Sequence, residues 1–302
     1  MIDKERTESV QLLQLRYLNT RGNLTEKERH YYTSLEKGFE GEVLFDERIV
    51  GFSDSWLFLN DVMLEHQNNY FQMDSLGFFQ EDLYLFEVKN YEGDFIVEGD
   101  KWKSTLGKDI KNPLHQLQRC ETFLRKFLQD QGFTVSIKPY LIFINPSFTL
   151  YQAPLNPSII FPTQLNTFLS GLNRSGRRTG ARQRQISNVL KAAHVDKYPG
   201  QKVPSYEFSN LKKGFVCSRC GSWMHVSSKQ RVVVCTTCGG SEELDKAVMR
   251  SVADFQLLFP EKKVNTVEIW EWCGNMPSKK TIQRILSRNF QRIGHNKAAY
   301  YI

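Results

Sequence analysis

Residues 83–89 read LYLFEVK, a mostly apolar run that ends in Glu87, Val88 and Lys89. The run follows the polar turn at residues 80–82, and this pattern predicts a buried strand. Side chains alternate along a strand, so Glu87 and Lys89 point to one face while Val88 points to the other. An unpaired buried charge is costly, so these charges need partners. The run therefore indicates either a structural Glu–Lys pair or a functional site.

Acidic residues elsewhere in the chain could join this strand end. Asp74 lies in the alternating, aromatic-rich segment 71–79, the predicted hairpin partner of the buried strand, and the register could bring it beside Glu87. Glu42, on a preceding helix, could supply a third acid. Carboxylates suit Mg²⁺, a hard cation, and the Lys89 ammonium could orient a water and stabilise negative charge on a phosphoryl group.

The flanking segments predict an α/β domain. A capping box of Thr25 and Glu28 indicates the start of one helix, in a segment that reads as helical through about residue 50. A second helix is predicted from about Pro113 to Gln129, followed by an apolar strand at residues 135–144. The predicted elements follow the order helix, hairpin, strand, helix and strand. This order predicts a mixed sheet flanked by helices.

Several runs in this region resemble the nuclease-related domain (NERD) family, which is placed in the PD-(D/E)xK nuclease superfamily. They are GFEGE at 38–42, QMD at 72–74, LFEVKNYEG at 85–93 and NPLHQ at 112–116. The resemblance covers residues 38–150 and implies a restriction-endonuclease-like fold. Met73 departs from the superfamily pattern, in which a proline commonly precedes the aspartate. The implied site consists of Glu42, Asp74 and Glu87 as acids, the last two binding catalytic Mg²⁺ or Mn²⁺, Lys89 as the catalytic lysine, and Gln116.

The cysteines indicate a second kind of metal site. Two C-x-x-C pairs have nearly the spacing of tandem zinc knuckles, and four thiolates leave no open position, so we predict structural Zn²⁺ in a zinc ribbon. His225 falls within the intervening hairpin and is predicted to be a surface or packing residue. Cys120 and Cys273 are predicted to be core thiols. The predicted zinc ligands are Cys217, Cys220, Cys235 and Cys238.

The C-terminal segment predicts a helix-turn-helix. A short helix at 266–273 is followed by a Gly-containing turn and by a second helix that Ser278 caps. Residues 290–302 could form a small wing, with the turn at 294–296. The alternative is a plain helical hairpin with a solvated basic face. The residues predicted to contact nucleic acid here are Lys279, Lys280, Arg284 and Arg288.

The charge distribution also favours a polyanionic partner. The net charge is +7, and no Asp or Glu occurs between Asp130 and Asp196. Arg177, Arg178 and Arg182 lie in this stretch and could contact phosphates, although a solvated linker is an equal alternative. No apolar run is long enough to span a bilayer, and the first residues lack the apolar centre of a signal peptide, so we expect a cytoplasmic protein without membrane contact.

These patterns predict five segments. They are a helical extension (1–37), a nuclease-like domain (38–170), a basic linker (171–205), a zinc ribbon (206–245) and a winged helix-turn-helix-like segment (246–302). The leading hypothesis is a Mg²⁺-dependent nuclease acting on nucleic acid, with DNA favoured over RNA. The first alternative is a non-catalytic nucleic-acid-binding or regulatory protein that uses the nuclease-like domain as a scaffold. A protein-interaction adaptor built on the ribbon is the third, and it leaves the carboxylates unexplained.

Overall fold

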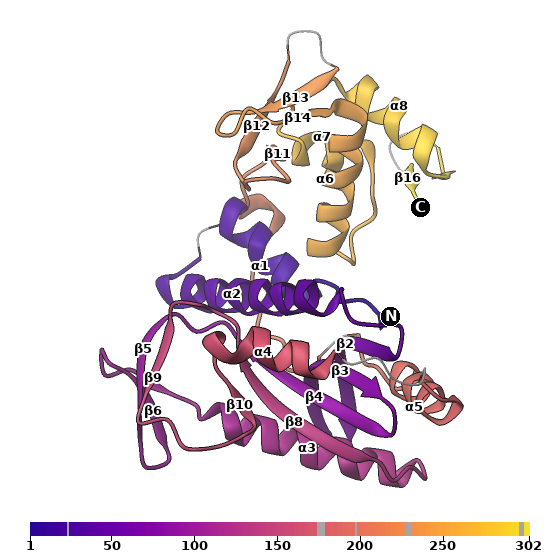
Figure 1. Cartoon of the computed structure of the whole chain (residues 1–302). Helices are drawn as coiled ribbons and strands as arrows, with labels where there is room; N and C mark the ends of the chain where they lie inside the picture. Colours follow the sequence, from indigo (N-terminus) through magenta and orange to yellow (C-terminus); the bar gives the residue numbers. More distant parts are fainter. Residues whose placement is uncertain (23, 174–178, 197, 228–230, 296–298) are drawn as a thin grey trace. The chain divides into compact units, whose positions relative to one another are not determined.

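The computed structural model describes residues 1–22, 24–173, 179–196, 198–227, 231–295 and 299–302 (Figure 1). They form two compact units. The first unit comprises Met1–Ser9 and Thr33–Gly200, and the second comprises Val10–Tyr32 and Gln201–Ile302. Each unit has its own hydrophobic core, and the helix α2 (Glu26–Ile49) contributes residues to both units.

A six-stranded mixed sheet forms the centre of the first unit. Its antiparallel part consists of β2, β3 and β4, while β1, β8 and β10 pair in parallel with their neighbours. The sequence therefore predicted the class of sheet correctly. The strands in spatial order are β1 (Ile2–Lys4), β2 (Trp56–His66), β3 (Asn69–Phe79), β4 (Asp82–Lys89), β8 (Ser136–Phe143) and β10 (Ile159–Ile160).

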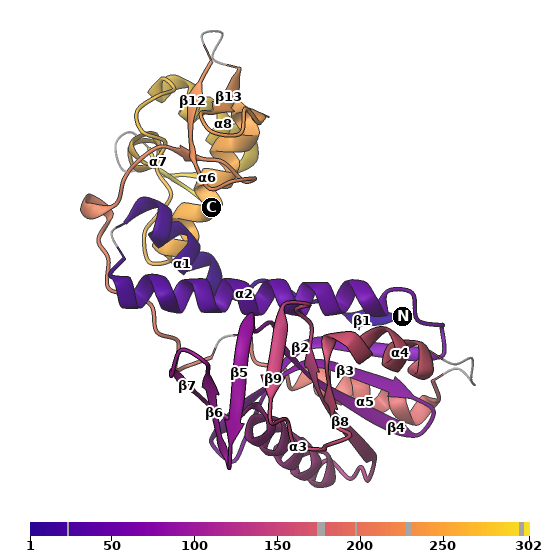
Figure 2. The same cartoon turned by 60° about the vertical axis from the view of Figure 1, so that its left-hand side comes forward.

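Helices cover both faces of this sheet (Figure 2). On one face, α2 and α4 (Pro162–Leu172) pack Phe45 and Leu165 against Phe86 of β4 and its neighbours. On the other face, α3 (Pro113–Asp130) and α5 (Ala181–Ala192) pack their apolar residues against the opposite side of the same strands. The chain thus buries the sheet between two layers of helices, as in other α/β domains.

A smaller sheet completes the first unit. It consists of β7 (Asp109–Ile110), β6 (Lys101–Ser104), β5 (Gly93–Glu98) and β9 (Phe148–Tyr151). Trp102 of β6 is buried in the main core of the unit and stacks on Phe143, with 6.1 Å between the ring centroids. Its role is therefore structural.

The second unit combines a ribbon of four short strands with several helices and a small hairpin. The strands β11 (Phe215–Val216), β12 (Trp223–Val226), β13 (Val232–Cys235) and β14 (Ser241–Glu243) form an antiparallel sheet. After them come α6 (Leu244–Leu258), α7 (Thr266–Trp272), α8 (Lys279–Asn289) and the paired strands β15 (Arg292–Ile293) and β16 (Tyr300–Tyr301). The preceding helix α1 (Val10–Arg21) packs on α6.

The C-terminal part has the arrangement of a winged helix. Ser278 caps α8 by accepting a hydrogen bond from the Thr281 amide at 3.1 Å, and Asn265 caps α7. Val264 forms a β-bridge with Tyr301, which attaches the hairpin strand β16 to the segment between α6 and α7. Residue 296 of the predicted wing turn lies outside the described residues.

The boundaries of the units differ from the predicted segments. The predicted linker contains α5, whose Ile186 and Leu190 are fully buried in the core of the first unit. Ser187 of this helix also donates a 2.6 Å hydrogen bond to Asp3, so α5 belongs to the first unit. The ribbon and the winged helix share one core, and the predicted N-terminal extension is divided between the units. Within the described parts of the chain, no helix is long and apolar enough to cross a membrane.

Candidate active site and metal centre

The two carboxylates predicted from the sequence meet where the β3–β4 ladder ends. The last backbone pair of this ladder joins Ser75 and Phe86, so Asp74 and Glu87 are the next residues on the two strands. Asp74 Oδ2 accepts a 2.8 Å hydrogen bond from the Val88 amide. Both acids are buried, with 7% of Asp74 and none of Glu87 exposed. The side chain of Asp74 therefore accepts a hydrogen bond from a β4 amide at the point where backbone pairing between β3 and β4 ends.

Lys89 lies on the same face of β4 as Glu87. Its Nζ is 2.6 Å from Glu87 Oε1, and it donates a 3.1 Å hydrogen bond to Oε1 of Gln116 on α3. Asn112 holds the start of α3 in place, because its Oδ1 accepts a hydrogen bond from the Leu114 amide at 2.9 Å. The alternation of side chains along β4 places Glu87 and Lys89 on one face, and the first turns of α3 place Gln116 beside them.

Glu42 reaches the same region through Arg6, a residue that the sequence patterns did not single out. The side chain of Arg6 is buried and forms a 2.5 Å ion pair with Glu42 and a 2.8 Å ion pair with Asp46. Its Nη2 also donates to the backbone carbonyl of Asp74 at 2.7 Å. Arg6 lies in a short N-terminal segment without periodicity, so no local signal marked it.

A close helix–loop contact lets α2 approach the site. A Cβ on Gly41 would lie 2.4 Å from the Cβ of Asn90, which directly follows β4. A side chain at Gly41 would therefore push α2 away from the end of β4 and move Glu42 with it. The helix continues through both Gly38 and Gly41. The glycine at 41 permits close packing instead of breaking the helix.

The acidic groups at this strand end outnumber the basic groups Arg6 and Lys89 that pair with them. Burial, followed by the charge of Asp74, raises the pKa of Glu87 to about 8. Burial also raises the pKa of Asp74, and burial together with Asp74 raises that of Glu42. Burial alone would lower the pKa of Lys89, but the Glu87 and Asp74 carboxylates raise it. The site is thus suited to an additional cation, because a buried carboxylate without a partner is costly.

The donor groups fit a hard divalent ion. Glu87 Oε2 is buried and has no hydrogen-bond partner among the described residues. A cation beside Asp74 and Glu87 would give this oxygen a partner and would offset the negative charge. The carboxylates of Glu42, Asp74 and Glu87 do not form a compact set of three ligands. In the described parts of the chain, only the four cysteines place three or more possible metal-ligand atoms within 4.8 Å of one another. An ion held by Asp74 and Glu87 alone would keep coordination positions open for water and phosphate.

Arg6→Met is expected to lower the free energy of unfolding by about 3 kcal/mol, the cost of leaving buried ion-pair partners without their cation. Arg6 is only 3% exposed, and its partners Glu42 and Asp46 are less than one-fifth exposed. Urea unfolding at neutral pH measures the change. Arg48→Met, which removes an exposed arginine of α2 bonded to Asn166, is the control. A loss no larger than that of the control would show that Arg6 is not needed to hold the acids.

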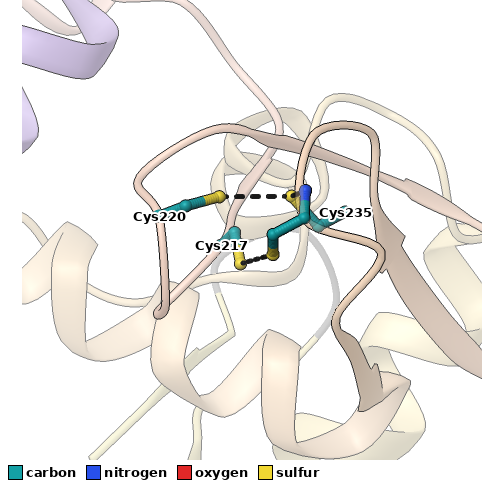
Figure 3. Close-up of side chains that lie close together, drawn as sticks. Cys217, Cys220 and Cys235 are labelled. Atoms are coloured by element: carbon teal, nitrogen blue, oxygen red, sulfur yellow. Dashed lines mark hydrogen bonds between the residues drawn. The ribbon is translucent and has the colours of Figure 1, made fainter.

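The four predicted zinc-ligand cysteines converge between β11 and β14 (Figure 3). The Sγ atoms of Cys220 and Cys235 are 3.4 Å apart, and those of Cys217 and Cys238 are 3.7 Å apart. A tetrahedral ion with bonds of about 2.3 Å to sulfur separates its ligands by roughly 3.8 Å, which is close to these values. The thiols therefore already have the spacing of a four-coordinate metal site.

Backbone turns orient these thiols. Gly221 and Gly239 follow the two knuckles with φ of 69° each, a conformation that glycine adopts without strain. The amides of Arg219 and Thr237 donate to the sulfurs of Cys217 and Cys235 at 3.4 Å. Hydrogen bonds from Ser222, together with one from Cys235, lower the pKa of Cys220 to about 6. The first knuckle thus favours the metal-binding thiolate form at Cys220.

The remaining sulfur and imidazole side chains lie elsewhere. His225 is exposed on β12, opposite Val234, and is not part of the cluster. Cys120 is buried in the first core, where its thiol donates to the Gln72 carbonyl, and Cys273 is buried in the second core. These positions agree with the structural roles expected for them.

Some of the basic residues predicted to contact nucleic acid already interact with other groups of the protein, and others form no ion pair among the described residues. Lys279 lies 4.2 Å from the ring centre of Trp270, and Arg288 forms a 2.9 Å ion pair with Asp245. Lys280 and Arg284 are exposed on α8 and form no ion pair among the described residues. Arg182 donates to the Thr134 carbonyl, so it is tied to the first unit. Arg177 and Arg178 lie outside the described residues.

Comparison with known proteins identifies one part of the chain. Residues 37–144 match the model of the nuclease-related domain family. The matched range contains Glu42, Asp74, Glu87, Lys89 and Gln116. Over these residues the chain is therefore similar to the nuclease-related domain, and the second unit holds a four-cysteine cluster that is consistent with a zinc ribbon. No curated protein and no solved structure matches the chain.

Proposed function

We propose that this chain is a metal-dependent nuclease that hydrolyses phosphodiester bonds in nucleic acid, with DNA favoured over RNA. The main support is the meeting of Asp74, Glu87, Lys89 and Gln116 at one strand end, within a match to a nuclease-related family. Preference for DNA rests on the winged-helix arrangement of the second unit, because such modules commonly place their second helix in the major groove of a duplex.

Each residue of the candidate active site would have a distinct role. Asp74 and Glu87 would hold Mg²⁺ or Mn²⁺, which when bound neutralises phosphate charge and makes water a better nucleophile. Lys89, positioned by Glu87 and Gln116, would orient the attacking water and stabilise negative charge on the phosphoryl oxygens. Arg6 would hold Glu42 in place through their ion pair.

The second unit would bind the substrate. Zn²⁺ is the ion that best suits four thiolates at these separations, and it would have a structural role. Lys280 and Arg284 of α8 would contact phosphates, because their charges are not neutralised by acids of the described chain.

Incubation with labelled single- and double-stranded DNA and RNA tests the proposal. Mg²⁺ or Mn²⁺ should permit cleavage, and EDTA should stop it. The variant Glu87→Gln, purified in parallel, controls for contaminating nucleases. Wild-type protein that binds nucleic acid but cleaves none of these substrates with either ion would overturn the proposal in favour of a non-catalytic binding protein.

Lys280→Ala combined with Arg284→Ala is expected to weaken binding of duplex DNA and to make it less dependent on salt. Two lost phosphate contacts should reduce the slope of log K against log salt by about 1.8 on duplex DNA. Fluorescence anisotropy over a salt series measures this slope. Lys246→Ala, at an exposed lysine of α6 paired with Glu243, is the matched control. An unchanged slope in the double variant would show that α8 is only a solvated basic face.

A further inference from the structure

A pocket in the first unit adjoins the candidate active site. It has a volume of about 570 Å³ and lies between β3 and the N-terminal half of α3. This volume falls in the range of ligand-binding pockets, roughly 300–1,000 Å³. Its lining residues include Tyr70, Phe71, Lys111, His115, Gln116 and Arg119.

The pocket and the active site share a wall. Gln116 lines the pocket and also accepts the hydrogen bond from Lys89 Nζ. Gln72, another lining residue, lies two residues before Asp74 on β3 and donates a 2.7 Å hydrogen bond to Asp61. A ligand in the pocket would therefore lie next to the groups proposed to act on a phosphodiester.

The charge of the lining suits an anion. None of the described residues that line the pocket is acidic. Lys111 and Arg119 are exposed and form no ion pair with described residues, while the guanidinium of Arg119 lies 5.4 Å from the ring centre of Phe123. His115 and Arg119 are spaced four residues apart on α3, so they lie on one face of the helix. The cations are thus available to bind phosphates.

Aromatic side chains complete the pocket on the β3 side. Phe71 is buried, and it stacks on Phe123 at 5.5 Å. Tyr70 is held by a 2.8 Å hydrogen bond to Glu65 and by an edge contact with Tyr198. Fixed aromatic rings beside cations are the surface on which unpaired bases stack, whereas a base inside a duplex cannot enter a pocket.

We propose that this pocket binds an unpaired nucleotide of the strand that is cut, with the base against the partly exposed ring of Tyr70 and the adjoining phosphates on Lys111 and Arg119. The assignment rests on the proposed nuclease function and deepens it. The substrate is then a nucleic acid that presents a single-stranded nucleotide beside the scissile bond, such as a single strand, a flap or an end that has come apart.

Photo-cross-linking tests the site directly. The full chain carrying Lys280→Ala and Arg284→Ala, which reduces binding by the second unit, is mixed in EDTA with a single-stranded oligothymidylate that contains 5-iododeoxyuridine. After irradiation, mass spectrometry is expected to locate the cross-link at Tyr70 or His115. A cross-link confined to other residues would overturn the proposal.

Affinity gives a second readout in the same background. Lys111→Ala with Arg119→Ala should weaken binding of the oligothymidylate about tenfold, and its salt slope should fall by about 1.4, the value for two contacts to a single strand. Lys126→Ala, at an exposed lysine of α3 outside the pocket, should change neither. Unchanged affinity in the double variant, or equal loss for a blunt duplex, would overturn the proposal. Because these measurements need no cleavage, they stand separately from the nuclease test.

Discussion

Asp74→Asn, Glu87→Gln and Lys89→Met are each expected to reduce metal-dependent cleavage on the order of a thousandfold or more, the scale seen when a group that stabilises transition-state charge is removed. The two amide variants remove acids proposed to hold the metal. Lys89→Met removes the ammonium that Glu87 and Gln116 position. Cleavage rates of a labelled DNA at saturating Mg²⁺ measure the effect.

Two features separate a catalytic role from a structural one. The combined variant Glu87→Gln, Lys89→Met should be little slower than either single variant, because groups that act as one unit are not additive. All variants should still bind DNA in EDTA, as anisotropy would show. Lys103→Met is the matched control, since it removes a lysine from an exposed pair with Glu98 on β5 and β6. Wild-type rates in the three single variants would refute the assignment of the site.

Cys217→Ser and Cys235→Ser should each abolish the binding of one zinc per chain and unfold the second unit. Both cysteines are buried in the core that the ribbon shares with α6, α7 and α8. The free energy of zinc binding by four such ligands, about 10–16 kcal/mol for small zinc modules, is also folding free energy. Elemental analysis gives the metal content, and limited proteolysis shows which unit loses its protection.

The matched control for this experiment is Cys273→Ser. Cys273 is fully buried in the same core but lies outside the cluster. The Cys273→Ser variant should be less stable than the wild-type protein but should still bind one zinc per chain. The effect of losing the metal can then be separated from the effect of losing a buried thiol. Freshly prepared, reduced wild-type protein without zinc would contradict the prediction.

Local patterns predicted the parts of the molecule that depend on neighbours in sequence. The alternation of LYLFEVK placed Glu87 and Lys89 on one face of β4, where their charged atoms are 2.6 Å apart. The C-x-x-C spacing predicted the thiol cluster, because each knuckle is a short turn whose geometry depends on residues within it. The caps at Thr25 and Ser278 were visible for the same reason.

Features that depend on contacts between distant segments were not visible. The chain separates Arg6 from Glu42 by 36 residues and from Asp74 by 68, so no spacing rule connects them. The basic segment around Arg182 suggested a linker, yet α5 buries Ile186 and Leu190 against the sheet. The pocket beside Gln116 likewise forms only when β3 and α3 come together.

The sequence by itself thus determined the class of sheet, the strand that carries Glu87 and Lys89, and the four cysteines, since hydrophobic period and ligand spacing are properties of short segments. Tertiary structure decided how the chain divides into two units, which cation holds Glu42, and how much the acids are desolvated. The physical reason is that burial and ion pairing depend on what packs around a side chain. That packing is set by the whole core and not by the residues next to it in the chain.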